Sequence, residues 1–343
     1  MISMHSKQAS CHITTRILSG FDDPSFSAAE WNRLLRRGDT NSVNLTAEWQ
    51  RSWWHTFGRG RLMLILGERH GRPAVLAPLF TDAGMIFNIC PEDALDFVGD
   101  VRDVSVVTAI LRRAMNAVPD FAGFRFYFIP DTSRTGLMLR ESAASMGLTC
   151  YNEGCLPSPA IDLVGEMDAA IRCTRKKSLV RHENYFRREG DLKVLHLQKA
   201  SDILPHLDEF FVQHIKRRAA TEVPSLFCEP KQRAYYRRLT TDIGPTGWLR
   251  FTRLNWNGQA IAFHFGLSYD GRYLFGIPSF AIEYAKHSPG EVLLRQLLLA
   301  AIDERATSFD FGIGDETYKY RFATRTTQLC TWGIYSENRG NDG

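Results

Sequence analysis

The sequence predicts a two-lobed α/β protein with a mixed sheet. A length of 343 residues suits two domains. Segments 248–255, 259–269 and 273–280 read as strands, and the dipeptides Asn257-Gly258 and Asp270-Gly271 between them are strong hairpin signals. A helical segment then precedes a short strand over 308–311. Because that helix must cross over the sheet, we expect this last strand to lie parallel to the 273–280 strand.

Composition indicates an ordinary globular protein. The chain is 44% hydrophobic and 23% charged, with a formal net charge of +4, which suits an anionic ligand without requiring nucleic acid. Seven scattered cysteines show no metal-ligand spacing, so we expect reduced thiols and no metal site. The N-terminus has no apolar signal-peptide core and no apolar run approaches ~20 residues, which favours a cytoplasmic protein. Peripheral membrane contact stays open, because an acceptor can be lipid-linked.

The first half alternates helices with strands. A stripe of Trp49, Trp53 and Phe57 at four-residue spacing is typical of an amphipathic helix, and His70-Gly71 suits a hairpin. The predicted helices are 27–37, 46–57, 104–118 and 137–146, and the predicted strands are 62–68, 73–80 and 124–129. The segment 150–160 contains two prolines and a glycine, so we place the domain boundary there, with lobes at 1–155 and 156–343.

The second half opens with a basic segment. Seven Arg or Lys residues lie between Arg172 and Arg188, opposed only by Glu183 and Glu189. Two interpretations are open, a solvated helix face or a surface for an anionic acceptor such as a nucleotide sugar, a lipid pyrophosphate or tRNA. We favour a binding surface for an anionic acceptor, because two carboxylates cannot neutralise seven positive charges. The candidate contacts are Arg175, Lys176 and Arg181. A strand over 192–197 and a helix over 203–218 follow.

A turn and a helix follow the meander. Leucines at three- and four-residue spacing predict a helix from Glu291 to Arg305. A helix N-terminus leaves N–H groups free and can hold a phosphate. The loop that would do so comprises Ser288, Pro289, Gly290, Glu291 and Val292. The alternative is a plain turn–helix junction, and the Glu291 carboxylate competes with an anion for the same N–H groups.

The stretch SPGEVLLRQLLLAAI followed by FDFGIGDETYKYRF resembles the C-terminal signature of the CelD-like GNAT acyltransferases of polysaccharide biosynthesis. These are similar in turn to the Fem-type peptidyltransferases. The resemblance implies two GNAT-like lobes, the first degenerate, with acyl-CoA as co-substrate and no metal. One departure is visible: the usual GNAT pyrophosphate loop has two spaced glycines, whereas here only Gly290 follows Lys286.

The loop after the last strand supplies candidate catalytic groups. Asp315 or Glu316 can accept the proton of an attacking amine, and Tyr318 can protonate a leaving thiolate. The residues do not decide between the two carboxylates. His264, in the middle of a strand, is a further candidate base, although internal histidines are usually core residues. The alternative is a solvated loop whose charges pair among themselves.

Together these observations predict an acyl-CoA-dependent N-acyltransferase. The expected reaction is acetyl transfer to an amine of a sugar or envelope-polysaccharide precursor, with Lys319 and Arg321 binding anionic groups of the substrate. Backbone N–H groups of the 273–280 strand would stabilise the thioester carbonyl. Two alternatives stay open: an aminoacyl-tRNA-dependent Fem-like peptidyltransferase, and a non-catalytic binding or scaffold protein with the same fold.

Overall fold

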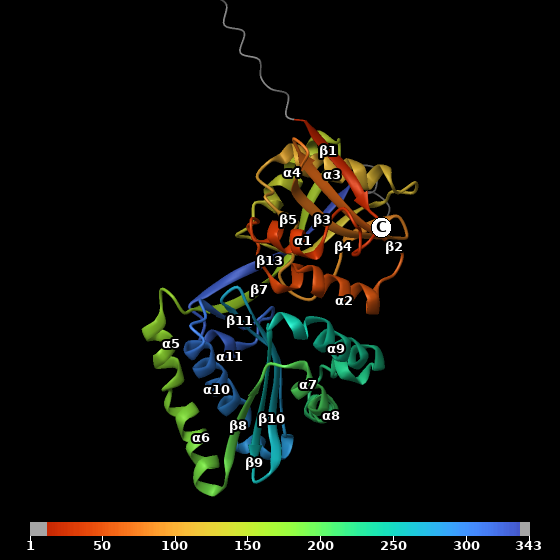
Figure 1. The fold of residues 1–343 in the computed structure, drawn as a ribbon. Coiled ribbons are helices and arrows are strands. Elements are labelled where there is room, and N and C mark those ends of the chain that lie inside the picture. The colour runs from red at the N-terminus through yellow and green to blue at the C-terminus, as the bar shows by residue number, and fades with distance from the viewer. Residues whose placement is uncertain (1–11, 337–343) are drawn as a thin grey trace, which may run out of the picture. The chain divides into compact units, whose positions relative to one another are not determined.

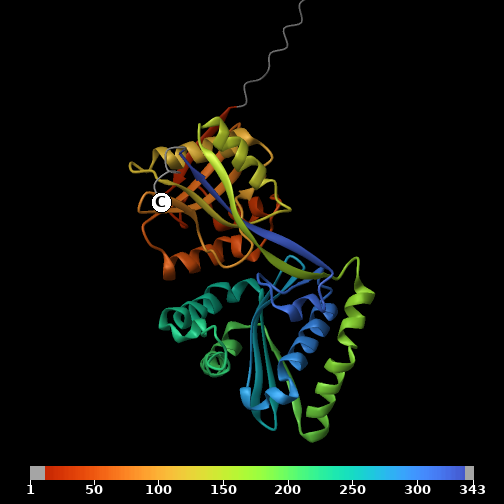
Figure 2. The same ribbon diagram turned by 180° about the vertical axis from the view of Figure 1, so that it is seen from behind.

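The computed structural model describes residues 12–336, which form two compact units (Figures 1 and 2). The first unit holds residues 12–50, 58–155 and 330–336, and the second holds 51–57 and 156–329. Residues 1–11 lie outside the described part of the chain. They include Cys11 and most of the N-terminal segment from which we predicted that there is no signal peptide. No helix among residues 12–336 is long and apolar enough to span a membrane.

The first unit is built on an antiparallel meander with a crossover helix. Its strand order is β1-β2-β3-β4-β6-β13-β7, with β5 paired to β3. Its strands are β1 (Ile13–Leu18), β2 (Arg61–Arg69), β3 (Arg72–Asp82), β4 (Met85–Asn88), β5 (Val98–Gly99), β6 (Gly123–Pro130), part of β7 (Thr149–Asp162) and part of β13 (Arg325–Tyr335). Its helices are α1 (Ala28–Leu35), α3 (Val104–Asn116) and α4 (Thr135–Ser145), with the start of α2 (Ala47–Phe57).

The second unit repeats this plan. Its strands follow the order β7-β12-β11-β10-β9-β8. They are β8 (Leu192–Leu197), β9 (Leu249–Trp256), β10 (Gln259–Tyr269), β11 (Arg272–Phe280) and β12 (Ser308–Asp310), beside the end of β7. Its helices are α5 (Met167–Thr174), α6 (Lys177–Glu189), α7 (Ala200–Ile203), α8 (Leu207–Arg218), α9 (Pro230–Ile243), α10 (Pro289–Asp303) and α11 (Thr317–Tyr320).

Two layers of helices cover the sheet of the second unit. Helices α5, α6 and α10 lie on one face, and α7, α8 and α9 lie on the other (Figure 1). The predicted leucine stripe of α10 is confirmed, since Leu293 and Leu297 are buried in a core with Tyr273 and Phe309. On the other face, the ring of Phe210 packs against those of residues from β9 and β10.

A buried carboxylate joins α6 to α10. Glu183 is almost fully buried and accepts hydrogen bonds from Arg187, Arg295 and Gln296. Such a charge is tolerated in a core because donors surround it. The basic segment is thereby held beside the helix that begins at the candidate donor loop.

Both predicted hairpins of the second unit are confirmed. The turn residues have the positive φ angles of type I′ geometry, 50° and 83° at Asn257-Gly258 and 47° and 76° at Asp270-Gly271. The structure has a further turn of this kind at Ala83-Gly84, with φ of 48° and 78°. The sequence analysis missed it because alanine is not a turn signal.

The segment in which we placed the domain boundary forms a strand. β7 runs through both prolines, Pro157 and Pro159, whose carbonyls accept hydrogen bonds from the N–H groups of Gly314 (2.9 Å) and Phe311 (3.0 Å). Pro157 and Pro159 act only as acceptors toward the segment 311–314, so the N–H groups that prolines lack are not needed on that side. The chain changes unit between Cys155 and Leu156 and returns to the first unit at Cys330, whereas we had predicted one uninterrupted second lobe.

A disulfide overturns part of the cysteine prediction. Cys155 on β7 and Cys330 on β13 are bonded, while Cys90, Cys150, Cys173 and Cys228 are free. The partners are 175 residues apart in sequence, so only the pairing of β7 with β13 brings them together. Among residues 12–336 there is no group of three His, Cys, Asp or Glu side chains that could hold a metal ion.

The parallel pairing predicted for the last strand is confirmed, and it is short. β11 pairs with β12 at only three positions, ending at Leu274 opposite Asp310. β12 then stops, whereas β11 continues to Phe280. Beyond Leu274, the β12 side of β11 therefore has no strand partner.

The first unit contains the same junction but closes it. β4 and β6 are parallel at three positions, ending at Phe87 opposite Arg125. The next residue, Asn88, places its side-chain amide against Tyr127, accepting from the backbone N–H (3.0 Å) and donating to the carbonyl (2.9 Å). A side chain thus continues the ladder where the strands diverge.

We predict that Asn88→Ala destabilises the first unit. The substitution leaves the N–H and carbonyl of Tyr127 without their partners, which should cost about 1–3 kcal/mol. Denaturant unfolding followed by tryptophan fluorescence would measure the loss. Asn152→Ala, which alters an exposed asparagine of the same unit, is the control. Equal stabilities of the two variants would contradict the proposed bridge.

Candidate functional site

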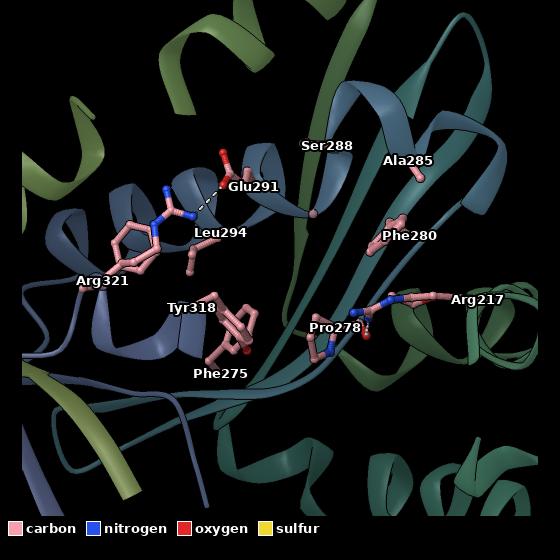
Figure 3. Close-up of a pocket in the computed structure, with 13 residues that line it drawn as sticks. Arg217, Phe275, Pro278, Phe280, Ala285, Ser288, Glu291, Leu294, Tyr318 and Arg321 are labelled. Carbon is pink, nitrogen blue, oxygen red and sulfur yellow. Dashed lines mark hydrogen bonds and ion pairs between the residues drawn. The ribbon is translucent and has the colours of Figure 1, made fainter. Parts of the chain in front are cut away.

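A pocket of about 240 Å³ lies beside the unpaired part of β11 in the second unit (Figure 3). Its floor is the run of β11 after the divergence, and the start of α10 and the region around α11 form two walls. Arg217 at the end of α8 supplies the remaining side. The lining residues used below are Phe275, Pro278, Ser279, Phe280, Ser288, Gly290, Glu291, Leu294, Tyr318, Arg321 and Phe322, with Arg217.

The predicted donor loop lies partly at this pocket. Ser288, Gly290 and Glu291 line it, whereas Pro289 and Val292 are buried beneath. Ser288 adopts the left-handed conformation, with φ of 55°, and its carbonyl accepts from the N–H groups of Glu291 (3.0 Å) and Val292 (3.3 Å). Of the three N–H groups expected to face a phosphate, two are therefore already used.

The Glu291 carboxylate is fixed at the mouth of the pocket. One oxygen accepts from the guanidinium of Arg321 (3.0 Å), and the other lies 3.0 Å from Nδ1 of His182. Arg321 also donates to the hydroxyl of Ser178 (3.3 Å). The cluster joins α6, α10 and the end of α11 through charges. Arg321 is thus beside the pocket as predicted, but it already has an internal anionic partner.

Tyr318 is the predicted catalytic residue that lines the pocket (Figure 3). Burial, followed by the charge of Glu316, raises the pKa of its phenol to about 12. The phenol is therefore protonated at neutral pH and able to donate. In the view of Figure 3 its ring lies on the side of the pocket away from Ser288 at the start of α10.

The two carboxylates of the loop are outside the pocket lining. Asp315 accepts from the phenol of Tyr320 (2.9 Å). Glu316 is half-exposed and pairs with Lys319 (2.8 Å). The charge of Glu316 is among the causes of the raised pKa of Tyr318, and that of Asp315 is not.

Lys319 is buried, with 3% of its surface exposed. Besides Glu316, its ammonium donates to the carbonyls of Gly312 (3.2 Å) and Ile313 (3.0 Å). Gly314, with φ of 134°, lets the loop wrap this closely, because a Cβ there would lie 3.0 Å from Nζ. In the structure Lys319 therefore organises the loop, whereas the sequence pattern led us to expect it to face a substrate anion.

His264 belongs to the core. It is fully buried, does not line the pocket, and stacks on Phe275 with ring centroids 5.3 Å apart. Burial lowers its pKa to about 3, so the imidazole is neutral at physiological pH. Gly266 is required beside it, because a Cβ at that position would come within 2.0 Å of the ring.

The basic segment is only partly neutralised. Arg187 and Arg188 pair with Glu183 and Glu189. Within residues 12–336 the other five cations have no carboxylate partner: Arg172, Arg175, Lys176, Lys177 and Arg181. The ammonium of Lys176 lies 5.4 Å from the ring centroid of Phe322, which also lines the pocket. The segment therefore begins close to the site.

Sequence reasoning missed Arg217 and the aromatic floor. Arg217 donates to the carbonyl of Pro278 (2.8 Å), and its guanidinium carbon lies 4.4 Å from the ring centroid of Phe280. It is one of three basic residues in the last turn of α8, a pattern usually explained by the helix dipole. No sequence signal shows that one of the three reaches across β11.

Comparisons with known proteins agree on the fold. Residues 174–320 match the family described as acetyltransferase (GNAT) domain. No curated protein matches the chain. A crystal structure of FemX has a TM-score of 0.63 at 9% identity, covering 90% of this chain and 96% of that one.

Two further solved structures are similar over most of their length. One is the C-terminal domain of a putative lysylphosphatidylglycerol synthetase from Agrobacterium fabrum, with a TM-score of 0.57, 16% identity, and 90% and 92% coverage of this chain and that one. The other is a tandem GNAT protein from the clavulanic acid biosynthesis pathway, with a TM-score of 0.52, 13% identity, and 95% and 99% coverage. Residues 174–320 of the second unit thus match a GNAT acetyltransferase domain, and the chain has the fold of tandem GNAT proteins.

Proposed function

We propose that this protein transfers an acyl group from an acyl-CoA to an amine, with the acyl thioester bound along the free edge of β11. The observation that carries this proposal is the apolar pocket at the divergence of β11 and β12. An extended thioester arm can lie beside a strand that has lost its neighbour, with aromatic side chains packed around it. The pocket also reaches the start of α10, where such donors place their phosphates.

The residues of the pocket suit the steps of acyl transfer. The unpaired edge of β11 offers backbone N–H groups for the thioester carbonyl, although Pro278 has none to offer. Tyr318 is protonated and positioned to give its proton to the departing thiolate. We assign the proton-accepting role to Glu316 rather than Asp315, acting through water, because it is the carboxylate that influences Tyr318.

The acceptor is expected to be anionic. The unpaired cations of the basic segment, including Arg175, Lys176 and Arg181, begin beside the pocket and suit a phosphate-bearing molecule. A sugar precursor of an envelope polysaccharide, as in the CelD-like group, has this chemistry. A lipid-linked form of it would bring the protein to a membrane surface.

A second function is favoured by one observation. Glu291 holds a carboxylate at the N-terminus of α10, where the diphosphate of CoA would otherwise bind. An aminoacyl-tRNA donor would not need that position and would use the basic segment instead. The fold shared with FemX is compatible with this alternative.

A thermal-shift assay with acetyl-CoA, CoA and total tRNA tests the proposal, because a ligand that binds the native state raises the melting temperature. Stabilisation by CoA compounds supports the leading proposal. Stabilisation by tRNA alone would replace it with the second function. No shift with any of the three would leave a non-catalytic protein with the GNAT fold.

We predict that Gly290→Asp weakens CoA binding at least tenfold. A Cβ at Gly290 would lie 3.2 Å from the ring of Phe280, and the new carboxylate would repel phosphates at the mouth of the pocket. Isothermal titration calorimetry would measure the affinity. Gly20→Asp adds the same charge at a position with no neighbouring atoms within 4 Å, so it should bind CoA like the wild type. Equal affinity in both variants would remove the start of α10 from the donor site.

We predict that Glu316→Gln lowers kcat by about 10²-fold or more, the range expected for a lost general base. The same change leaves the buried Lys319 ammonium without its anion, so stability should fall as well. The double variant Glu316→Gln, Lys319→Met removes both charges. It also removes the donor to the carbonyls of Gly312 and Ile313, so stability should recover only in part while kcat stays low. Recovery of both would show that Glu316 only holds the loop, and Asp315→Asn should have a modest effect throughout.

A further inference from the structure

Three hydrogen-bond donors line the pocket, and no carboxylate in the described part of the chain accepts from any of them. They are the guanidinium of Arg217, the hydroxyl of Ser279 and the phenol of Tyr318. Arg217 reaches this place from α8, across β11 from α10 (Figures 1 and 3). The arrangement therefore lies opposite the start of α10.

Arg217 is a cation without an anionic partner. A guanidinium has five N–H donors, and the structure gives Arg217 one protein acceptor, the carbonyl of Pro278. Among residues 12–336 it forms no ion pair, in contrast to Arg321 on the far wall, which is bound to Glu291. Its partial burial disfavours the charged form and lowers its pKa, and no carboxylate of the described residues offsets that effect.

Ser279 is an independent sign of a missing acceptor. It has no exposed surface, and its Oγ has no hydrogen-bond partner among the described residues. A buried hydroxyl without a partner costs free energy, and such groups are uncommon unless a ligand or water satisfies them. Ser279 lines the same pocket as Arg217, so both residues border the space that a ligand would fill.

The pocket contains no free carboxylate that could serve instead. Glu291 is the acidic residue in its lining, and both of its oxygens are already engaged by Arg321 and His182. The positive charge of Arg217 therefore faces an apolar floor formed by Phe275 and Phe280. A ligand with an apolar stem and an anionic end matches this distribution of charge.

We propose that Arg217 and Ser279 bind an oxyanion, a carboxylate or a phosphate, on one of the two substrates. The inference rests on the proposed function, and it adds a substrate class to it. The oxyanion has two possible sources: a terminal carboxylate on the transferred acyl group, as in a dicarboxylic acyl thioester, or an acidic group of the acceptor. Either source would make bidentate contacts with the planar guanidinium.

A purely structural role for Arg217 makes a different prediction. Its bond to Pro278 and its contact with Phe280 fasten α8 to β11, and a cation suits the C-terminus of a helix. Replacement would then lower the melting temperature without changing which ligands the protein prefers. Ligand discrimination is accordingly the readout that separates the two roles.

The test compares wild-type protein with Arg217→Gln, Ser279→Ala and the control Arg218→Gln. Arg218 is the next residue of α8, also lacks an ion pair in the described part of the chain, and does not line the pocket. Ser279→Ala removes a hydroxyl that has no protein partner, so the fold should not suffer. In the first arm, calorimetry measures the binding of succinyl-CoA and of butyryl-CoA. The butyryl group is similar in length to the succinyl group but lacks its terminal carboxylate.

In the second arm, the melting temperature of protein saturated with CoA is measured in inorganic phosphate, in acetate and in chloride at equal ionic strength. An acyl-borne oxyanion predicts that wild type prefers succinyl-CoA about tenfold or more, the effect of one charged hydrogen-bonded pair. An acceptor-borne oxyanion predicts stabilisation by phosphate or acetate beyond chloride. Either effect should vanish in Arg217→Gln, weaken in Ser279→Ala and persist in Arg218→Gln.

The outcomes separate this inference from the proposed function. Equal binding of both thioesters, with no anion effect, would overturn the oxyanion site and leave the acyl-CoA proposal standing. If CoA and its thioesters do not bind, the anion experiment is carried out without CoA. Stabilisation by anions that depends on Arg217 would then contradict the proposal of an acyl-CoA donor and support the oxyanion site. A preference unchanged in Arg217→Gln would also overturn the inference.

Discussion

The site of this protein depends on how few residues of β11 and β12 pair. Three parallel pairs hold the strands together up to Leu274 and Asp310, and the ladder then ends. β12 stops because the chain turns at Gly312, whose N–H is taken by the Asp310 side chain (2.9 Å), and then wraps around Lys319. β11 is left with an open edge, so the pocket, the start of α10 and Tyr318 all take their positions from this divergence.

In the first unit the same topology is bridged by a side chain at its parallel junction. It has the same antiparallel meander, crossover helix and three-residue parallel pairing, but Asn88 bridges the gap to Tyr127. The corresponding position of the second unit, directly after the last pair, is Phe275, which has no polar group and lines the pocket instead. The side chain of Asn88 thus bridges the junction of the first unit, whereas Phe275 offers no such bridge in the second.

Local patterns in the sequence predicted the elements of the second unit well. The turn dipeptides, the leucine stripe of α10 and the crossover rule each depend on neighbouring residues or on chain handedness. Side-chain partners could not be predicted in the same way. Lys319 is buried because a loop with two glycines folds its carbonyls around the ammonium. Arg217 donates to the carbonyl of Pro278, which is 61 residues away in the sequence. The strand β13 was not predicted, and the chain from Cys330 on was assigned to the wrong unit, because local patterns do not reveal which neighbour a distant segment joins. The residues of the candidate site could not be predicted for the same reason, because the sequence does not show which side chains of a loop point into the pocket.

Hydrogen–deuterium exchange with and without acetyl-CoA tests the central claim most directly, since it reports on both junctions in one experiment. Binding along the free edge of β11 predicts slower exchange over residues 275–280 and 288–294, with no change over 86–89 and 124–128 of the first unit. Protection confined to the first unit, or equal in both, would contradict the account. Unchanged exchange at 275–280 with saturating acetyl-CoA would contradict it as well, because the thioester arm would then lie elsewhere.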